Sequence, residues 1–220
     1  MNTIKQHART AGLLYLLLVP LGLFGILYTP TLVVSGDVAA TVGNILAHKN
    51  LFSASIASAL AVQVAQIFLV LALYRLFKET SKVWSTLLVA LIIPAVSIAM
   101  LNEVNRAAVL VLLSGAEYLS AFTEAQVHAL IQMFLELHTY GIYVAQIFWG
   151  LWLLPMGVLA YTSGFIPKFI GVLLVIACFG YLFDSLAPFL SLIEWTVSEW
   201  TSIGEFFILI WLLHLGFMKK

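Results

Sequence analysis

Six long apolar stretches, almost free of charged residues, constrain this chain more than any other feature. An α-helix needs about 20 mostly apolar residues to cross ~30 Å of hydrocarbon, and within a bilayer it pairs its own backbone polar groups. The first stretch is longer than the core of a signal peptide, so we expect it to be retained. The pattern predicts an all-α, polytopic transmembrane bundle of six helices in a single membrane domain, residues 1–220. The spans are residues 11–28, 51–73, 83–101, 138–161, 165–189 and 203–218.

Composition excludes several classes of protein. Hydrophobic residues make up 63% of the chain and charged residues only 9%, whereas soluble domains carry roughly 25% charged residues. An ordinary soluble enzyme and a disordered chain are therefore excluded. We expect no nucleic-acid partner, because 10 Lys and Arg residues balance 10 Asp and Glu residues. The single cysteine, Cys178, excludes an internal disulfide and a cysteine-based metal site.

The basic residues are spread unevenly over the loops, which indicates the orientation of the chain. Lys and Arg concentrate in the cytoplasmic loops of membrane proteins. With the N-terminus in the cytoplasm, eight basic residues lie inside and two, Lys49 and Arg106, lie outside. We therefore expect a multi-pass protein of the cell membrane with both termini cytoplasmic. The eight inner residues are Lys5, Arg9, Arg75, Lys78, Lys82, Lys168, Lys219 and Lys220.

The connections on the outer side are long, and we expect them to form a helical cap. Asp37 is placed to cap a short helix, because an acid favours a helix N-terminus. Four side chains give this helix one apolar face, with which it would lie flat on the outer surface. They are Val38, Val42, Ile45 and Leu46.

The second outer connection is predicted to lengthen two membrane helices. Residues 107–113 are apolar and extend the third helix, and Gly115 follows its end. Thr123 and Gln126 have the spacing of a capping box, in which each side chain bonds the other residue's backbone N–H. The fourth helix is therefore expected to start near Glu124 and to run unbroken into the bilayer.

Polar side chains on four helices are expected at one level in the outer leaflet. Ionisable groups in a membrane span cost a few kcal/mol on insertion scales, which makes them candidates for function. Two of these polar residues lie at the end of the third span and one at the start of the fourth. One lies about 28 Å along the fifth span, and one lies at the start of the sixth. Their convergence predicts a ligand-binding site. The five residues are Asn102, Arg106, His138, Asp184 and Glu205.

A purely structural role for the same residues stays open. Arg106 has a potential partner in Glu103, three residues earlier on one helix face, and another in Glu205. Asp184 precedes a proline and fits a turn at the interface. His138 fits a histidine that bonds a neighbouring carbonyl group.

Three functions fit these observations. We favour binding or transport of a small amphipathic or lipid-like ligand in an outer-leaflet pocket, because apolar walls with a few polar groups are typical of such pockets. The first alternative is an intramembrane metal-dependent hydrolase, with His138, Asp184 and Glu205 as ligands of a metal that activates water. The second is a structural or accessory subunit. We lean towards a protein that is not an enzyme and assign no catalytic residue. No cofactor is identified, and the expected partners are the lipid bilayer and the ligand.

Several segments, in order along the chain, resemble the bacterial membrane family known as domain of unknown function 4386. The resemblance implies a bacterial multi-span protein of the inner membrane, and it implies no activity or site. The matching segments are residues 9–15 (RTAGLLY), 35–40 (SGDVAA), 119–124 (LSAFTE), 137–141 (LHTYG), 163–168 (SGFIPK) and 181–185 (YLFDS).

Overall fold

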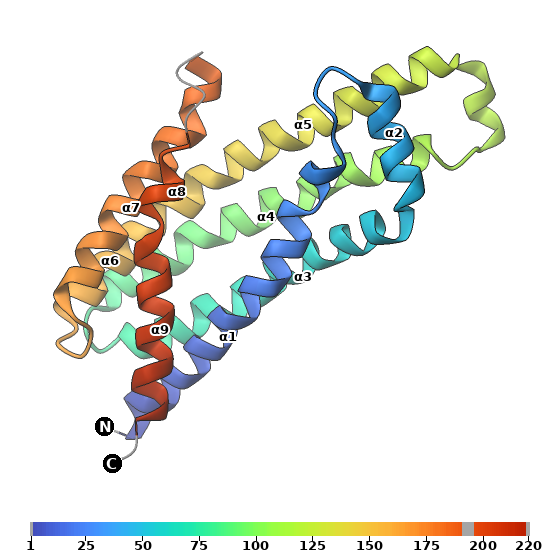
Figure 1. Cartoon of the computed structure of the whole chain (residues 1–220). Helices are drawn as coiled ribbons and strands as arrows, with labels where there is room; N and C mark the ends of the chain where they lie inside the picture. The colour runs from blue at the N-terminus through green and yellow to red at the C-terminus, as the bar shows by residue number, and fades with distance from the viewer. Residues whose placement is uncertain (1, 191–195, 219–220) are drawn as a thin grey trace. The chain divides into compact units, whose positions relative to one another are not determined.

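A computed structural model of the chain describes residues 2–190 and 196–218, and every regular element within these ranges is a helix. Lys219 and Lys220 lie outside the described residues. Figure 1 shows the α-helices α1 to α9, which the short 3-10 helices η1 to η3 supplement. In chain order the elements are α1 (Asn2–Leu27), η1 (Thr29–Leu32), α2 (Val38–Ala47), α3 (Lys49–Phe77), α4 (Lys82–Leu112), η2 (Glu117–Ala121), α5 (Glu124–Leu151), α6 (Leu153–Thr162), α7 (Lys168–Leu186), η3 (Ala187–Leu190), α8 (Ser198–Thr201) and α9 (Ile203–Phe217).

Six helical segments are long and apolar enough to cross a membrane, which confirms the predicted fold class. Each contains most of one expected apolar stretch, and several extend well beyond it. The segments are Thr3–Leu32, Lys49–Phe77, Lys82–Leu112, Glu124–Thr162, Lys168–Leu190 and Ser198–Phe217.

The local signals set most of the helix ends. The predicted capping box forms, because Thr123 N donates to Gln126 Oε1 at 2.8 Å and Gln126 N donates to Thr123 Oγ1 at 3.3 Å. The third membrane helix extends to Leu112, as expected, and Gly115 follows with a left-handed φ of 71°. The fifth membrane helix begins at Lys168 rather than at residue 165. Pro167 directly precedes this helix, and a proline favours extended backbone in the residue before it.

The chain forms two compact units, each of which takes part of α1, α3, α4 and α5. We call residues 19–64 and 98–142 the α2 unit. Residues 1–18, 65–97 and 143–220 are the hairpin unit, named for its helical hairpin of α6 and α7.

In the α2 unit, α2 turns its apolar face into a core rather than lying flat. Asp37 caps the helix as predicted, since its Oδ1 accepts from Ala40 N at 2.9 Å. Val42 and Ile45 are buried, whereas Leu46 is exposed and is not part of the buried face. The core draws on η1, α2, α3, α4 and α5 through Leu32, Val42, Ile45, Phe52, Ile56, Val109, Ile131 and Leu135.

The hairpin unit depends on close helix contacts at glycine. A Cβ on Gly157 of α6 would lie 2.7 Å from the carbonyl oxygen of Gly171 on α7, so the backbones meet where neither residue has a side chain. α7 also packs against α9, and Trp211 of α9 donates its indole N–H to the Phe165 carbonyl oxygen at 2.9 Å.

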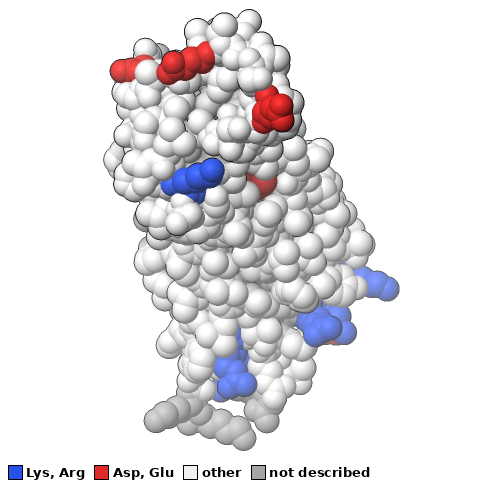
Figure 2. Space-filling model, turned by 90° about the vertical axis from the view of Figure 1, so that its right-hand side faces the viewer, with Lys and Arg blue, Asp and Glu red and all other residues white. Residues whose placement is uncertain are grey.

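Basic residues gather at one end of the hairpin unit. Lys5 Nζ donates to the Met218 carbonyl oxygen at 3.3 Å, which places the start of α1 beside the end of α9. The Phe77 and Phe165 rings stack at 5.8 Å, which places the end of α3 beside the loop before α7. Large areas of the face in Figure 2 carry no charged side chain, as expected of helices that face lipid. The described basic residues at these ends are Lys5, Arg9, Arg75, Lys78, Lys82 and Lys168.

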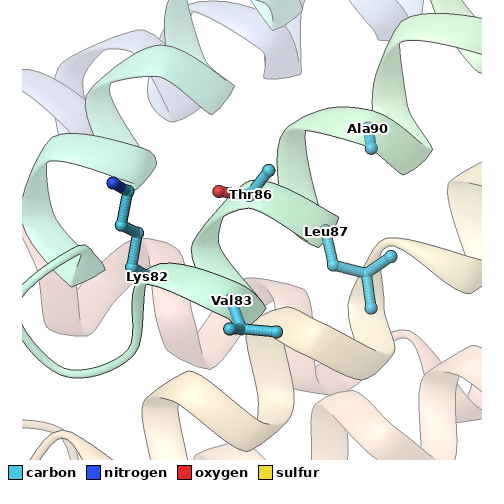
Figure 3. A pocket seen from close by; sticks show the side chains of 5 residues that line it. All are labelled: Lys82, Val83, Thr86, Leu87 and Ala90. Carbon is cyan, nitrogen blue, oxygen red and sulfur yellow. The ribbon is translucent and has the colours of Figure 1, made fainter.

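An open groove of about 510 Å³ follows the first turns of α4 within this unit. Its lining, shown in Figure 3, consists of Lys82, Val83, Thr86, Leu87 and Ala90.

Candidate functional site

Arg106 is the centre of a buried polar network in the α2 unit. Its side chain is only 1% exposed, and α4 directs it towards α1 and α3. Nη1 donates to the Gly25 carbonyl oxygen at 2.9 Å and to Thr29 Oγ1 at 2.7 Å, with Ser55 Oγ at 3.4 Å. A close approach makes room for these bonds, because a Cβ on Gly25 would lie 2.5 Å from the backbone nitrogen of Ala59.

Glu103 balances the charge of Arg106 one turn earlier on α4. Arg106 Nε donates to Glu103 Oε2 at 2.6 Å, and Nη2 forms an ion pair with the same oxygen. The other carboxylate oxygen, Oε1, lies 3.4 Å from His138 Nε2 of α5. One carboxylate thus joins a fully buried guanidinium group to an imidazole ring whose side chain is 13% exposed.

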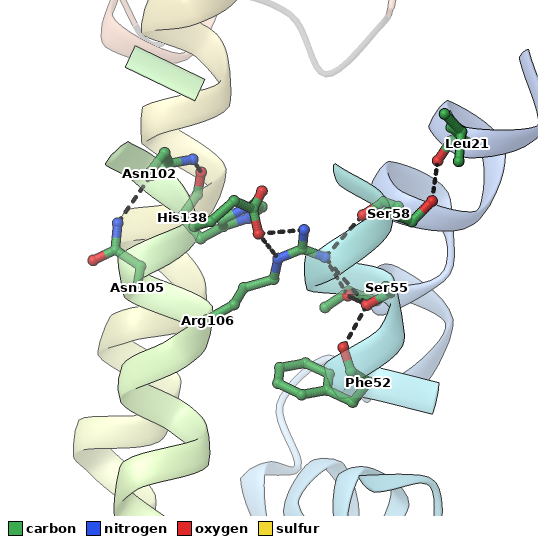
Figure 4. Close-up of polar contacts among 11 residues, drawn as sticks. Leu21, Phe52, Ser55, Ser58, Asn102, Asn105, Arg106 and His138 are labelled. Carbon is green, nitrogen blue, oxygen red and sulfur yellow. Dashed lines mark hydrogen bonds and ion pairs between the residues drawn. The ribbon is translucent and has the colours of Figure 1, made fainter. Parts of the chain in front are cut away.

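Beside this pair Asn102 connects α4 to α5, and Asn105 of the same helix bonds Asn102 (Figure 4). Asn102 Nδ2 donates to the His138 carbonyl oxygen at 2.8 Å, and Asn105 Nδ2 donates to Asn102 Oδ1 at 2.9 Å. The amide of Asn102 occupies the place where a side chain on Gly141 would lie, so α5 needs a glycine there. Asn105 and His138 are only partly buried, so the network reaches the surface at these two residues.

In the hairpin unit the carboxylate of Glu205 is hydrogen-bonded by tyrosine hydroxyl groups rather than paired with a cation. Glu205 of α9 accepts a hydrogen bond on each oxygen, from the Tyr15 hydroxyl group at 3.0 Å and from the Tyr181 hydroxyl group at 2.9 Å. Tyr15 lies on α1 and Tyr181 on α7, so Glu205 joins three helices of the unit. Among the ion pairs of the described residues, none involves Glu205.

Asp184 also has a structural partner within the hairpin unit. Its Oδ1 accepts from Val197 N at 2.8 Å, and its Oδ2 accepts from Ser198 N at 2.7 Å. These N–H groups belong to the start of α8, where a helix has no internal acceptors for them. Asp184 therefore caps a helix 13 residues further along the chain.

The five predicted site residues fall into these two settings. Asn102, Arg106 and His138 share one network of the α2 unit, together with Glu103, which was predicted only as a partner of Arg106. Asp184 and Glu205 bond within the hairpin unit. The hydroxyl partners Thr29 and Ser55 of Arg106 were missed, and so were Tyr15 and Tyr181, the partners of Glu205. Nothing local in the sequence links any of them to a charged residue more than 20 positions away.

A metal centre is not evident in the described part of the chain. Within residues 2–190 and 196–218, no group of three or more His, Cys, Asp or Glu side chains is arranged to hold a metal ion. The predicted ligands His138, Asp184 and Glu205 have the protein partners given above.

Comparison with known proteins agrees on the family and adds no activity. The sequence model of the family described as Domain of unknown function (DUF4386) matches residues 10–216. An "Uncharacterized protein" of Archaeoglobus fulgidus is 37% identical over 73 residues, which are 33% of this chain and 44% of that protein. This chain thus spans less than half the length of that relative. No solved structure matches the chain.

Proposed function

The chain belongs to the family described as Domain of unknown function (DUF4386), and from this premise we propose that it binds a small amphipathic, lipid-like ligand. We place the ligand at the polar network of the α2 unit, on the outer side of the membrane. One observation carries the proposal: a hydrogen-bonded network inside a membrane helix bundle extends to the surface at Asn105 and His138.

The buried end of the network is surrounded by protein groups, and Nη2 of Arg106 has only its ion pair with Glu103 among the described residues. The guanidinium group of Arg106 is shared among Glu103, Thr29, Ser55 and the Gly25 carbonyl oxygen. Polar groups in hydrocarbon need such partners, because each unsatisfied one costs several kcal/mol. We therefore assign this end the task of fixing the position and charge of Glu103.

The surface end has the chemistry of an amphipathic site. The ring of His138 is held by Glu103, and Asn105 has used only its amide nitrogen in the contacts described above. Leu101 is 73% exposed and Val104 is 60% exposed, each within one turn of Asn105 on α4. A polar head group would bond Asn105 and His138, while an apolar tail lies against these exposed side chains. Asp184 and Glu205 are not part of this surface.

Native mass spectrometry of the purified protein tests the proposal. We expect the wild type to retain an amphiphile from the membrane, or to bind one from a panel of a fatty acid and a lysophospholipid. His138→Ala and Asn105→Ala should each reduce the occupancy at least fivefold. The matched control is His128→Ala, because His128 lies on the same helix, away from the network, and its Nε2 lies 3.9 Å from Glu124 Oε1.

Two results would contradict the proposal. If neither variant changes the occupancy of any bound amphiphile, the network has no ligand. If the variants lower the thermal stability of the protein while the wild type binds nothing from the panel, the network is structural, as in an accessory subunit.

We infer further that the protein lies in the cell membrane with both termini in the cytoplasm. The basic end of the hairpin unit supports this orientation, because cytoplasmic loops carry an excess of Lys and Arg. Lys49→Cys and Lys78→Cys, each in a Cys178→Ala background, should react from opposite sides with an impermeant thiol reagent in intact cells. Equal labelling of both from outside would contradict the orientation.

A further inference from the structure

We propose that the groove along α4 in the hairpin unit binds one anionic phospholipid, with its phosphate group against the Lys82 ammonium group. This site is independent of the network around Arg106 and lies in the other unit. Three observations carry it: the order of the groove's side chains along the helix, the absence of an ion pair at Lys82 among the described residues, and the basic end of the unit.

The lining side chains form two neighbouring rows on α4. Residues four positions apart lie on the same side of a helix, about 6 Å apart along its axis. The first row is Lys82, Thr86 and Ala90, and the second is Val83 and Leu87. Figure 3 shows the Lys82 and Thr86 side chains along one edge of the helix and those of Val83 and Leu87 along another.

The first row changes from charged to apolar in the direction in which α4 leaves the basic end. Lys82 offers an ammonium group, Thr86 one turn further a hydroxyl group, and Ala90 another turn further only a methyl group. A phospholipid has the same order, from phosphate through ester groups to acyl chain. Val83 and Leu87 complete the wall against which the acyl chain would lie.

The charge of Lys82 is available to a ligand. In the described part of the chain Lys82 makes no ion pair, whereas Lys78 in the preceding loop lies 3.8 Å from Glu79. Arg75, in the last turn of the preceding helix α3, adds a further positive charge to this end of the unit. Anionic lipids of the cytoplasmic leaflet are attracted by such clusters of basic residues.

The test compares phosphatidylglycerol with phosphatidylcholine of identical acyl chains, both added to the delipidated protein and measured by native mass spectrometry. The wild type should bind the first phosphatidylglycerol molecule about fivefold more tightly, the effect of one basic residue near a membrane surface. Lys82→Gln should abolish this preference, and Lys78→Gln, the matched control, should preserve it. Thr86→Val should reduce the affinity for both lipids about twofold.

Further arms identify the occupant. Ala90→Phe fills the apolar part of the groove and should weaken the binding of both lipids. Glycerol phosphate, which has no acyl chains, should not compete with either lipid. Competition by glycerol phosphate would instead mean a site for a free phosphate group. Equal binding of both lipids to the wild type, or equal losses in Lys82→Gln and Lys78→Gln, would overturn the proposal. Lys82 is exposed, so its substitution leaves the core unchanged.

Discussion

Glu103 in the α2 unit and Glu205 in the hairpin unit are both carboxylates on membrane helices, and their units satisfy them with different chemistry. Glu103 faces a guanidinium group and an imidazole ring. Glu205 faces two tyrosine hydroxyl groups and no cation within the described residues. The Glu103 arrangement is an ion pair of opposite charges. The Glu205 arrangement joins three helices through neutral hydrogen-bond donors. A carboxylate in a membrane helix is therefore not by itself a sign of one kind of site.

The largest effect is expected when the guanidinium group is removed. Arg106→Met leaves Glu103 buried without its counter-charge, which should reduce the free energy of unfolding by about 3 kcal/mol. Adding Glu103→Gln to this variant should restore part of the loss, because the unpaired charge is then gone. SDS titration in detergent micelles measures both values, and Lys49→Met, at an exposed position, is the control.

Replacing the two carboxylates in turn tests the contrast directly. Glu103→Gln leaves Arg106 without a counter-charge and should reduce the free energy of unfolding by about 3 kcal/mol. Glu205→Gln keeps an acceptor for one tyrosine and a donor for the other. It should therefore reduce the free energy of unfolding by only about 1 kcal/mol. The same titration serves, with the exposed Glu136→Gln as the control. Equal costs for the two substitutions would mean that the two sites do not differ as described.

The smallest effects concern helix caps, one from each unit. Asp184→Ala removes the acceptor of Val197 N and Ser198 N, and Thr123→Ala removes that of Gln126 N, so each should cost about 1 kcal/mol. Hydrogen exchange should accelerate at residues 197 and 198 in the first variant and at residue 126 in the second. Unchanged exchange at residues 197 and 198 would show that Asp184 does not hold the start of α8.

The sequence predicted those features that depend on neighbours along the chain. The six spans follow from length and hydropathy, and the capping box of Thr123 and Gln126 depends on residues three positions apart. The pairing of Glu103 with Arg106, one of the structural alternatives, likewise needs only one turn of one helix.

The contacts that the sequence could not predict join distant segments. Tyr15 and Glu205 are 190 positions apart, and only the packing of α1 against α9 brings their side chains together. Asp184 is of a residue type that caps helices, but the helix that it caps begins 13 residues later rather than at the next residue. Hydropathy estimates the depth of a polar residue in the membrane but not its rotation about the helix axis, which decides its partners.

The position of Glu103 one turn before Arg106 also has a consequence for biosynthesis. Ribosomes make α1 and α3 before α4, so Gly25, Thr29 and Ser55 are already present when Arg106 emerges. The ion pair forms as soon as this part of α4 is helical, and the helix can then enter the lipid with its two opposite charges already paired. His138 follows on α5 and bonds a carboxylate that α4 has already paired with Arg106, so the ion pair itself needs no later segment of the chain.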